Sequence, residues 1–134
     1  MSEETMASRQ AVQDASGKAA QTVPYPVGPD VAKTYALVRH AIQKREQLLG
    51  FHEGHWVTVC PHVLGWRAGE PVALCYELFG APQAVREPLG SPRLWRWIRL
   101  ADFRAVTTRT GFWFSTPRQL RPALDELEVE IEVA

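Results

Sequence analysis

The chain has 134 residues, 46% of them hydrophobic, which is typical of one globular domain with a single core. No segment approaches the ~20 consecutive apolar residues of a membrane-spanning helix. Residues 1–18 also lack the apolar core of a signal peptide. We therefore expect a cytoplasmic protein that does not associate with membranes.

The formal net charge is zero, from 15 basic and 15 acidic side chains, but the charges are unevenly distributed. Residues 30–115 carry eleven basic and seven acidic side chains, whereas residues 116–134 carry two and five. A basic middle region favours anionic ligands. A net of plus four is too modest to indicate nucleic-acid binding by itself, so nucleic acid is a weak alternative partner.

The N-terminal residues predict a tail. Residues 1–22 are rich in Ser, Ala, Gln and Glu with almost no large apolar side chain, which predicts disorder. Residues 23–29 contain three prolines and predict an extended lead-in. Tyr25 stands between two of these prolines and is placed to dock on the domain surface. We therefore assign residues 1–29 to a disordered or extended tail.

A helix is predicted over residues 31–49. Asp30 is a good N-cap, and Gly50 is a typical stop signal. Between them, charged residues occupy one face and apolar residues recur at helical spacing on the other. The apolar stripe comprises Val31, Tyr35, Val38, Ile42, Leu48 and Leu49.

After Gly50 the residues are typical of short β-strands joined by turns. Pro61 suits the end or the edge of a strand. Three prolines and two glycines make residues 80–92 a loop. The expected strands cover residues 56–60 with their continuation 63–66, then 72–79, 94–100, and 103–110 with an extension through 112–114.

Residues 127–133 alternate strictly between apolar side chains and glutamates. This pattern predicts either a final edge strand with an outward row of charges that opposes aggregation, or a solvated acidic tail. The whole pattern predicts an α+β, mainly β fold with one N-terminal helix. The helix is followed by a small, strongly bent antiparallel sheet or barrel of four to five strands. The expected units are the tail 1–29, a domain 30–116 and an acidic segment 117–134.

Three phrases in the middle of the chain resemble the WYL-domain family in its short stand-alone form. They are V-C-P-H-V-L-G at residues 59–65, L-C-Y-E at 74–77 and W-R-W-I-R-L-A-D-F at 95–103. The resemblance implies an SH3-like, Sm-type β-barrel. In larger family members this module senses a ligand, thought to be a nucleotide or nucleic acid, and controls an attached helix-turn-helix. A second helix of that kind is not expected here.

The phrases depart from the family pattern at three places. Cys60 stands where an acidic residue is usual, and Pro71-Val72-Ala73-Leu74 replaces the name-giving Trp-Tyr-Leu triplet. Ala101-Asp102 replaces an acidic or an acidic and basic pair. The resemblance nevertheless places a recurrent arginine at Arg99.

The tryptophan strand at residues 94–100 has two alternative interpretations. Trp95, Trp97 and Arg99 share one face because side chains alternate along a strand. Tryptophan and arginine stack on planar ligands, and arginine grips phosphate, so this face can bind an anion. Alternatively, Trp95 and Trp97 pack under the helix, and Arg99 pairs with a carboxylate. The expected carboxylates for that pair are Asp102 and Glu77.

A group of histidines and cysteines is a candidate metal or nucleophile site. Its members are His52, His55, Cys60, His62 and Cys75. Their spacing matches no closed zinc site, and neither an orienting acid nor an oxyanion-hole turn accompanies the cysteines. We therefore expect His62 to hydrogen-bond to the backbone, the cysteines to be buried without a disulfide, and no metal, cofactor or catalytic residue.

The apolar run Phe112-Trp113-Phe114 either closes the barrel or forms a patch for self-association. The function predicted from all these features is a non-enzymatic, ligand-sensing or regulatory module that binds a nucleotide or another anionic ligand. The predicted ligand-binding residues are Arg99, Arg96, Tyr76, Trp97 and His62. A protein-interaction or homo-oligomeric assembly module is the main alternative, and a metal site or cysteine enzyme is a further one.

Overall fold

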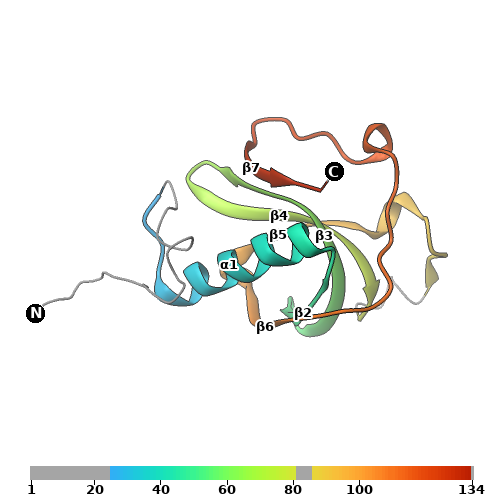
Figure 1. The fold of residues 1–134 in the computed structure, drawn as a ribbon, viewed down its shortest axis with the longest axis horizontal. Helices are drawn as coiled ribbons and strands as arrows, with labels where there is room; N and C mark the ends of the chain where they lie inside the picture. The colour runs from blue at the N-terminus through green and yellow to red at the C-terminus, as the bar shows by residue number, and fades with distance from the viewer. Residues whose placement is uncertain (1–24, 81–85, 134) are drawn as a thin grey trace, which may run out of the picture.

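The computed structural model describes residues 25–80 and 86–133. The disorder predicted for residues 1–22 and the centre of the predicted loop at 81–85 lie outside these residues. The described part folds into one α-helix and a six-stranded antiparallel sheet (Figure 1). The elements are α1 (Pro29–Lys44), β2 (Gln47–His52), β3 (His55–Arg67), β4 (Glu70–Phe79), η2 (Pro92–Leu94), β5 (Trp95–Arg99), η3 (Leu100–Asp102), β6 (Phe103–Arg109), η4 (Arg118–Leu120) and β7 (Glu128–Glu132).

Helix α1 is shorter than the helix predicted over 31–49. It ends at Lys44, and the capping residue Arg45 adopts the left-handed conformation with φ 53° and donates its backbone N–H to the Ala41 carbonyl. The prediction was wrong for Leu48 and Leu49, which lie in β2 between β3 and β6. Two neighbouring strands supply backbone hydrogen bonds there, and this tertiary pairing outweighs the local helical spacing.

Gly50 was interpreted as a helix stop, and this was also wrong. It lies inside β2, where a Cβ atom would lie 2.5 Å from a ring carbon of Phe103. The glycine is therefore required by the close approach of a buried aromatic ring and not by a turn.

The sheet has the strand order β5-β4-β3-β2-β6, with β7 added beside β3. It contains six strands where four to five were predicted, and its path is not closed between β5 and β6. Strand β3 pairs with β2 through Val59 and with β7 from Val63 onward. Pro61 therefore lies in the gap between two partners of one edge, and β3 continues through the predicted strand break.

The C-terminal residues form an edge strand, so the solvated-tail alternative was wrong. The glutamates of β7 do not simply face solvent, because each meets a partner from elsewhere in the chain. Glu128 accepts a hydrogen bond from the Tyr25 hydroxyl at 2.8 Å, and Arg39 of α1 approaches Glu130 at 3.4 Å. The Tyr25 ring also lies 5.1 Å from that of Trp66, which confirms the predicted docking of this residue.

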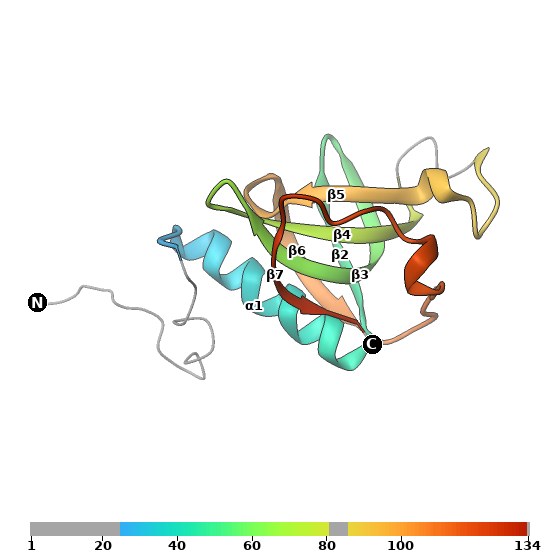
Figure 2. The ribbon, with the colours of Figure 1, turned by 90° about the horizontal axis from the view of Figure 1, so that it is seen from above.

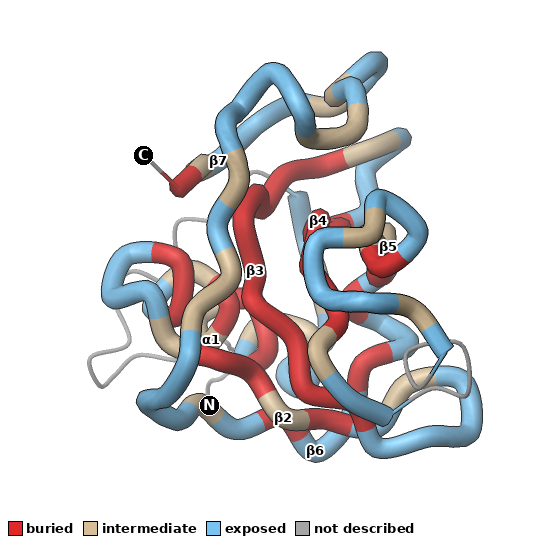
Figure 3. Tube along the Cα trace, turned by 90° about the vertical axis from the view of Figure 1, so that its right-hand side faces the viewer, coloured by how far each residue is buried: buried red, intermediate tan, exposed pale blue. Residues whose placement is uncertain are grey.

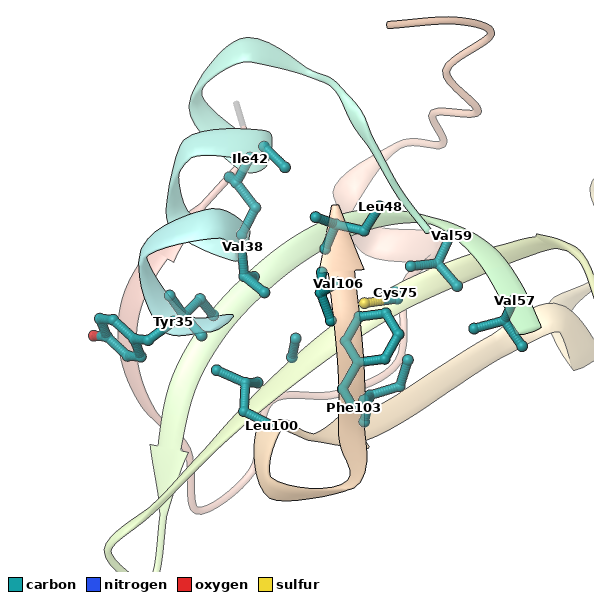
Figure 4. Packing of buried hydrophobic residues seen from close by; sticks show 14 of the residues in the cluster. Tyr35, Val38, Ile42, Leu48, Val57, Val59, Cys75, Leu100, Phe103 and Val106 are labelled. Atoms are coloured by element: carbon teal, nitrogen blue, oxygen red, sulfur yellow. The ribbon is translucent and has the colours of Figure 1, made fainter. Parts of the chain in front are cut away.

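Two apolar clusters occupy the two faces of the sheet. The larger lies under α1, where Tyr35, Val38 and Ile42 pack toward the sheet (Figure 4). The smaller contains Cys60, Tyr76 and Leu94, and Leu78, Trp95, Trp113 and Phe114 pack against it. Residues 57–66 of β3 are buried throughout because both faces of this strand are covered (Figure 3).

The alternation predicted for the tryptophan strand is found, but the alternative that packs Trp95 under the helix was wrong. Ile98 belongs to the cluster under α1, whereas Trp95 packs in the cluster on the opposite face. The predicted strand 112–114 is irregular. In the described residues, no helix combines the length and hydropathy needed to cross a lipid bilayer.

Substituting Gly50→Ala should lower the free energy of unfolding by about 1–3 kcal/mol, because the added methyl group overlaps the Phe103 ring in a packed core. Urea denaturation measures this loss. In the double variant Gly50→Ala/Phe103→Leu the smaller side chain relieves the overlap, so the combined loss should be smaller than the sum of the single losses. Strictly additive losses would contradict the proposed contact.

Candidate functional site

The five residues predicted to bind a ligand do not meet in one site. Arg99 is 54% exposed, and its guanidinium contacts Glu70 at 3.1 Å and Asp102 at 3.4 Å. The predicted pair with Asp102 is therefore present, whereas Glu77 pairs with a different arginine. Two carboxylates around one guanidinium leave a local excess of negative charge, which disfavours an anion at Arg99.

Arg96 has a structural partner. Its Nε atom lies 3.0 Å from Oε1 of Glu77, whose side chain is only 2% exposed. A buried carboxylate needs a nearby cation and hydrogen bonds, since transfer of the charge out of water is costly. Arg96 therefore neutralises Glu77.

Replacing Arg96 by methionine should destabilise the fold by about 3 kcal/mol or more, because it removes the cation beside a buried carboxylate. The matched variant Arg99→Met removes an exposed arginine and should change stability by less than about 1 kcal/mol. Thermal and urea denaturation of the two variants measure the difference. Equal losses would show that Arg96 does not have this role.

Trp97 and Tyr76 are also engaged within the protein. The guanidinium carbon of Arg67 lies 4.5 Å from the centre of the Trp97 ring, so a cation of the chain itself covers that ring. The Tyr76 hydroxyl donates to the Ser91 carbonyl at 3.0 Å and accepts from the Gly90 N–H at 2.7 Å. Because of these contacts, neither ring is open for a planar ligand to stack on.

His62 is fully buried in the smaller apolar cluster. Its Nδ1 atom lies 2.8 Å from the Cys60 carbonyl, which confirms the predicted hydrogen bond to the backbone. The ring stacks on Trp113 at 5.0 Å and meets the edge of Trp95 at 4.8 Å. The pKa of His62 is lowered to about 4, mainly by burial and to a smaller extent by the nearby charge of Arg121. His62 is therefore neutral near pH 7.

The cysteines do not have the environment of a nucleophile. Burial raises the pKa of Cys60 to about 11, and its thiol donates weakly to the Phe112 carbonyl at 3.9 Å. Burial also raises the pKa of Cys75. A reactive thiolate requires a lowered pKa. Both thiols are free, as expected, and residues 25–80 and 86–133 contain no cluster of three potential metal ligands.

The low pKa of His62 predicts a loss of stability in acid. The unfolded chain binds a proton near the ordinary histidine pKa of about 6.5, whereas the folded protein binds it only near 4. Neutral His62 therefore contributes about 3 kcal/mol at most to the free energy of unfolding. This contribution is complete above pH ~6.5 and is lost as the pH falls toward ~4. Urea denaturation of the wild type at about pH 7 and about pH 4.5 measures the total loss.

His62→Asn retains a side-chain N–H beside the Cys60 carbonyl but cannot titrate. The variant should show a smaller loss between the two pH values, because the carboxylates contribute equally to both proteins. An identical pH dependence in the variant would contradict the role assigned to His62.

The run Phe112–Phe114 is divided between interior and surface. Trp113 stacks on His62, and Phe114 stacks on Tyr76 at 4.0 Å, so both cover the smaller cluster. Phe112 is exposed, while its backbone carbonyl accepts a hydrogen bond from the Gln47 side chain at 2.7 Å. The run therefore covers the sheet, and the self-association patch predicted for all three residues is reduced to Phe112.

The chain brings two other arginines together between this run and β7. Arg118 begins the 3₁₀ helix η4, and Arg121 follows it by three residues, the spacing that places two side chains on one face of a 3₁₀ turn. Both contact Glu132 of β7, Arg118 at 2.8 Å and Arg121 at 3.4 Å. The segment that carries them crosses above the sheet before the chain returns as β7 (Figure 2).

Two hollows flank this group of Arg118, Arg121 and Glu132, which we call the arginine cluster. The first, the hydroxyl-lined hollow, has a volume of about 530 Å³ and is also lined by Ser115, Thr116, Pro117 and Val133. The second, the aliphatic hollow, has a volume of about 400 Å³ and is also lined by Val63, Gln119, Pro122, Ala123 and Leu124. The arginine cluster lines both.

Arg121 is the most constrained member of the cluster. Its side chain is only 6% exposed, and its terminal nitrogens donate to the carbonyls of Thr116 at 3.2 Å and Val133 at 3.5 Å. Its buried Nε atom has no hydrogen-bond partner within the described residues. Burial lowers the pKa of Arg121, and the positive charges of Arg118 and Arg45 act in the same direction. The cluster therefore combines an unused donor with an excess of positive charge.

Sequence reasoning missed this cluster because residues 116–134 were treated as one acidic segment. The available signal was the phrase P-R-Q-L-R-P at residues 117–122, in which two arginines three residues apart stand between prolines. The partner carboxylate, Glu132, could not be identified because eleven residues and a change of direction separate it from Arg121.

No family model, curated protein or solved structure matches this chain.

Proposed function

We propose that this protein is a non-enzymatic, ligand-sensing module that binds an anionic small molecule at the arginine cluster. The observation that carries the proposal is Arg121, which lines two hollows and whose buried Nε atom has no hydrogen-bond partner within the described residues. In the linings of both hollows, two arginines face one carboxylate. Unlike Arg96 and Arg99, this pair therefore has the charge excess that an anion requires.

An anion such as phosphate suits these side chains. Guanidinium groups present several donors in a planar fork that matches the oxygen atoms of phosphate and carboxylate groups. Glu132 pairs with both arginines, so a ligand would have to share or replace that carboxylate. The hydroxyl groups of Ser115 and Thr116 lie in the same lining and offer further donors.

The resemblance to the WYL-domain family supports ligand sensing and an SH3-like, Sm-type arrangement of the bent sheet. The site differs from the one the resemblance implies, because Arg99 is already held by Glu70 and Asp102. The two free, buried cysteines fit the reducing cytoplasm, where we place the protein. A nucleotide remains one member of the proposed ligand class.

The proposal predicts that inorganic phosphate binds the full-length protein, as measured by isothermal titration calorimetry. Arg118→Ala should weaken binding by about tenfold or more, because it removes a charged hydrogen-bond donor at the rim of the hollow. Arg118 is largely exposed, so the fold should tolerate the change.

Arg99→Ala is the matched control, because it also removes an exposed arginine that pairs with a glutamate. The control variant should bind phosphate like the wild type. If Arg99→Ala weakened phosphate binding and Arg118→Ala did not, the anion would bind at Arg99, the position implied by the family resemblance. Absence of phosphate binding to the wild type would contradict the proposed function.

A protein-interaction module is a second candidate, supported by aromatic side chains on the surface. Trp56 is 55% exposed and meets Phe51 edge-on at 5.4 Å at the hairpin between β2 and β3. Phe79 and Phe112 are also exposed. Exposed aromatic side chains are typical of interfaces. Sedimentation of the free protein separates a self-associating module from a monomeric ligand sensor.

A further inference from the structure

We infer that the ligand consists of an anionic head joined to a small apolar body, with the head on the arginine cluster and the body in the aliphatic hollow. This inference rests on the proposed function and specifies its ligand class. The observation behind it is the contrast between two hollows that share the same arginines.

The two hollows differ in the atoms that they offer. The hydroxyl-lined hollow presents Ser115 and Thr116, which form hydrogen bonds with the oxygen atoms of an anion. The aliphatic hollow is lined by Pro122, Ala123 and Leu124, which offer no side-chain hydrogen bond and favour apolar groups, and Gln119 is its one polar side chain outside the arginine cluster. One part of the surrounding surface therefore suits the charged head, and the other suits an apolar substituent.

The arginine cluster connects these two environments. Arg118 and Arg121 line both hollows, so an anion bound to their guanidinium groups lies at the boundary between them. A substituent on that anion has direct access to the aliphatic hollow. A free phosphate ion would leave the apolar part of this hollow, formed by Pro122, Ala123 and Leu124, to water, which gains little from such walls.

The aliphatic hollow is large enough for the apolar body of a small organic ligand. Its volume of about 400 Å³ lies at the lower end of the range for small-molecule sites, which is roughly 300–1,000 Å³. This space holds a ring or a short alkyl chain without crowding, because a cavity of about 150 Å³ is already enough for benzene. The inferred ligand is therefore an organic ester or acid with a charged head, of which an aromatic phosphate monoester is a simple example.

Phenyl phosphate and inorganic phosphate provide the test, since they share the head and differ in the apolar body. We expect the full-length protein to bind phenyl phosphate about tenfold or more tightly than inorganic phosphate in calorimetric titrations. Leu124→Ala should weaken the binding of phenyl phosphate several-fold and leave the affinity for inorganic phosphate unchanged, because it removes part of the aliphatic wall.

Leu124→Trp is a second variant, which fills the hollow instead of emptying it. It should also weaken the binding of phenyl phosphate without changing the affinity for inorganic phosphate. Thermal denaturation establishes that each variant is folded. Arg118→Ala should weaken both anions, because both place the head on the arginine cluster.

The outcomes separate this inference from the proposed function. Equal affinities for the two anions, with no effect of either Leu124 variant, would overturn the inference while leaving anion binding at the arginine cluster intact. Failure of both anions to bind the wild type would overturn the proposed function and, with it, the inference. Tighter binding of phenyl phosphate that survives both Leu124 variants would place the apolar body elsewhere and overturn the inference.

Discussion

The sharing of β3 among three partner strands is the constraint on which the rest of this structure depends. One edge of β3 pairs with β4, and the other pairs first with β2 and then with β7. Pro61, which lacks an N–H, lies where that second edge changes partner, and the register with β4 shifts between Pro61 and Val63. Such irregularities bend a strand. The bend brings the C-terminal strand beside the sheet that the N-terminal helix covers.

The charges of the C-terminal segment follow from this arrangement. β7 carries glutamates at alternate positions, and each has a partner from another part of the chain: Tyr25, Arg39, and the pair Arg118 and Arg121. A row of charges that would be expected to keep an edge strand in solvent instead attaches β7 to the domain. Glu132 also holds the two arginines beside the hollows, so the strand that completes the sheet also forms one wall of the candidate site.

Much of the fold could be predicted from local patterns. The apolar spacing of Val31, Tyr35 and Val38 indicated the helix, and the alternation along residues 127–133 indicated one of two outcomes that included a strand. The end of the helix was not predictable in this way, because Leu48 fits both the helical stripe and the buried strand β2. Gly50 was misinterpreted for a related reason: the Phe103 ring that requires it lies more than fifty residues away.

The sequence by itself determined the α+β class, the positions of most strands, and the alternation that separates Ile98 from Trp95 and Trp97. These features depend on local spacing, which a single chain segment contains. Tertiary structure alone decided which face of β5 meets the helix and which arginines already have carboxylate partners. It held Arg99 between Glu70 and Asp102, and it placed Arg118 and Arg121 around the single Glu132. Charge balance at a site depends on distances across the fold, and local residue patterns do not contain those distances.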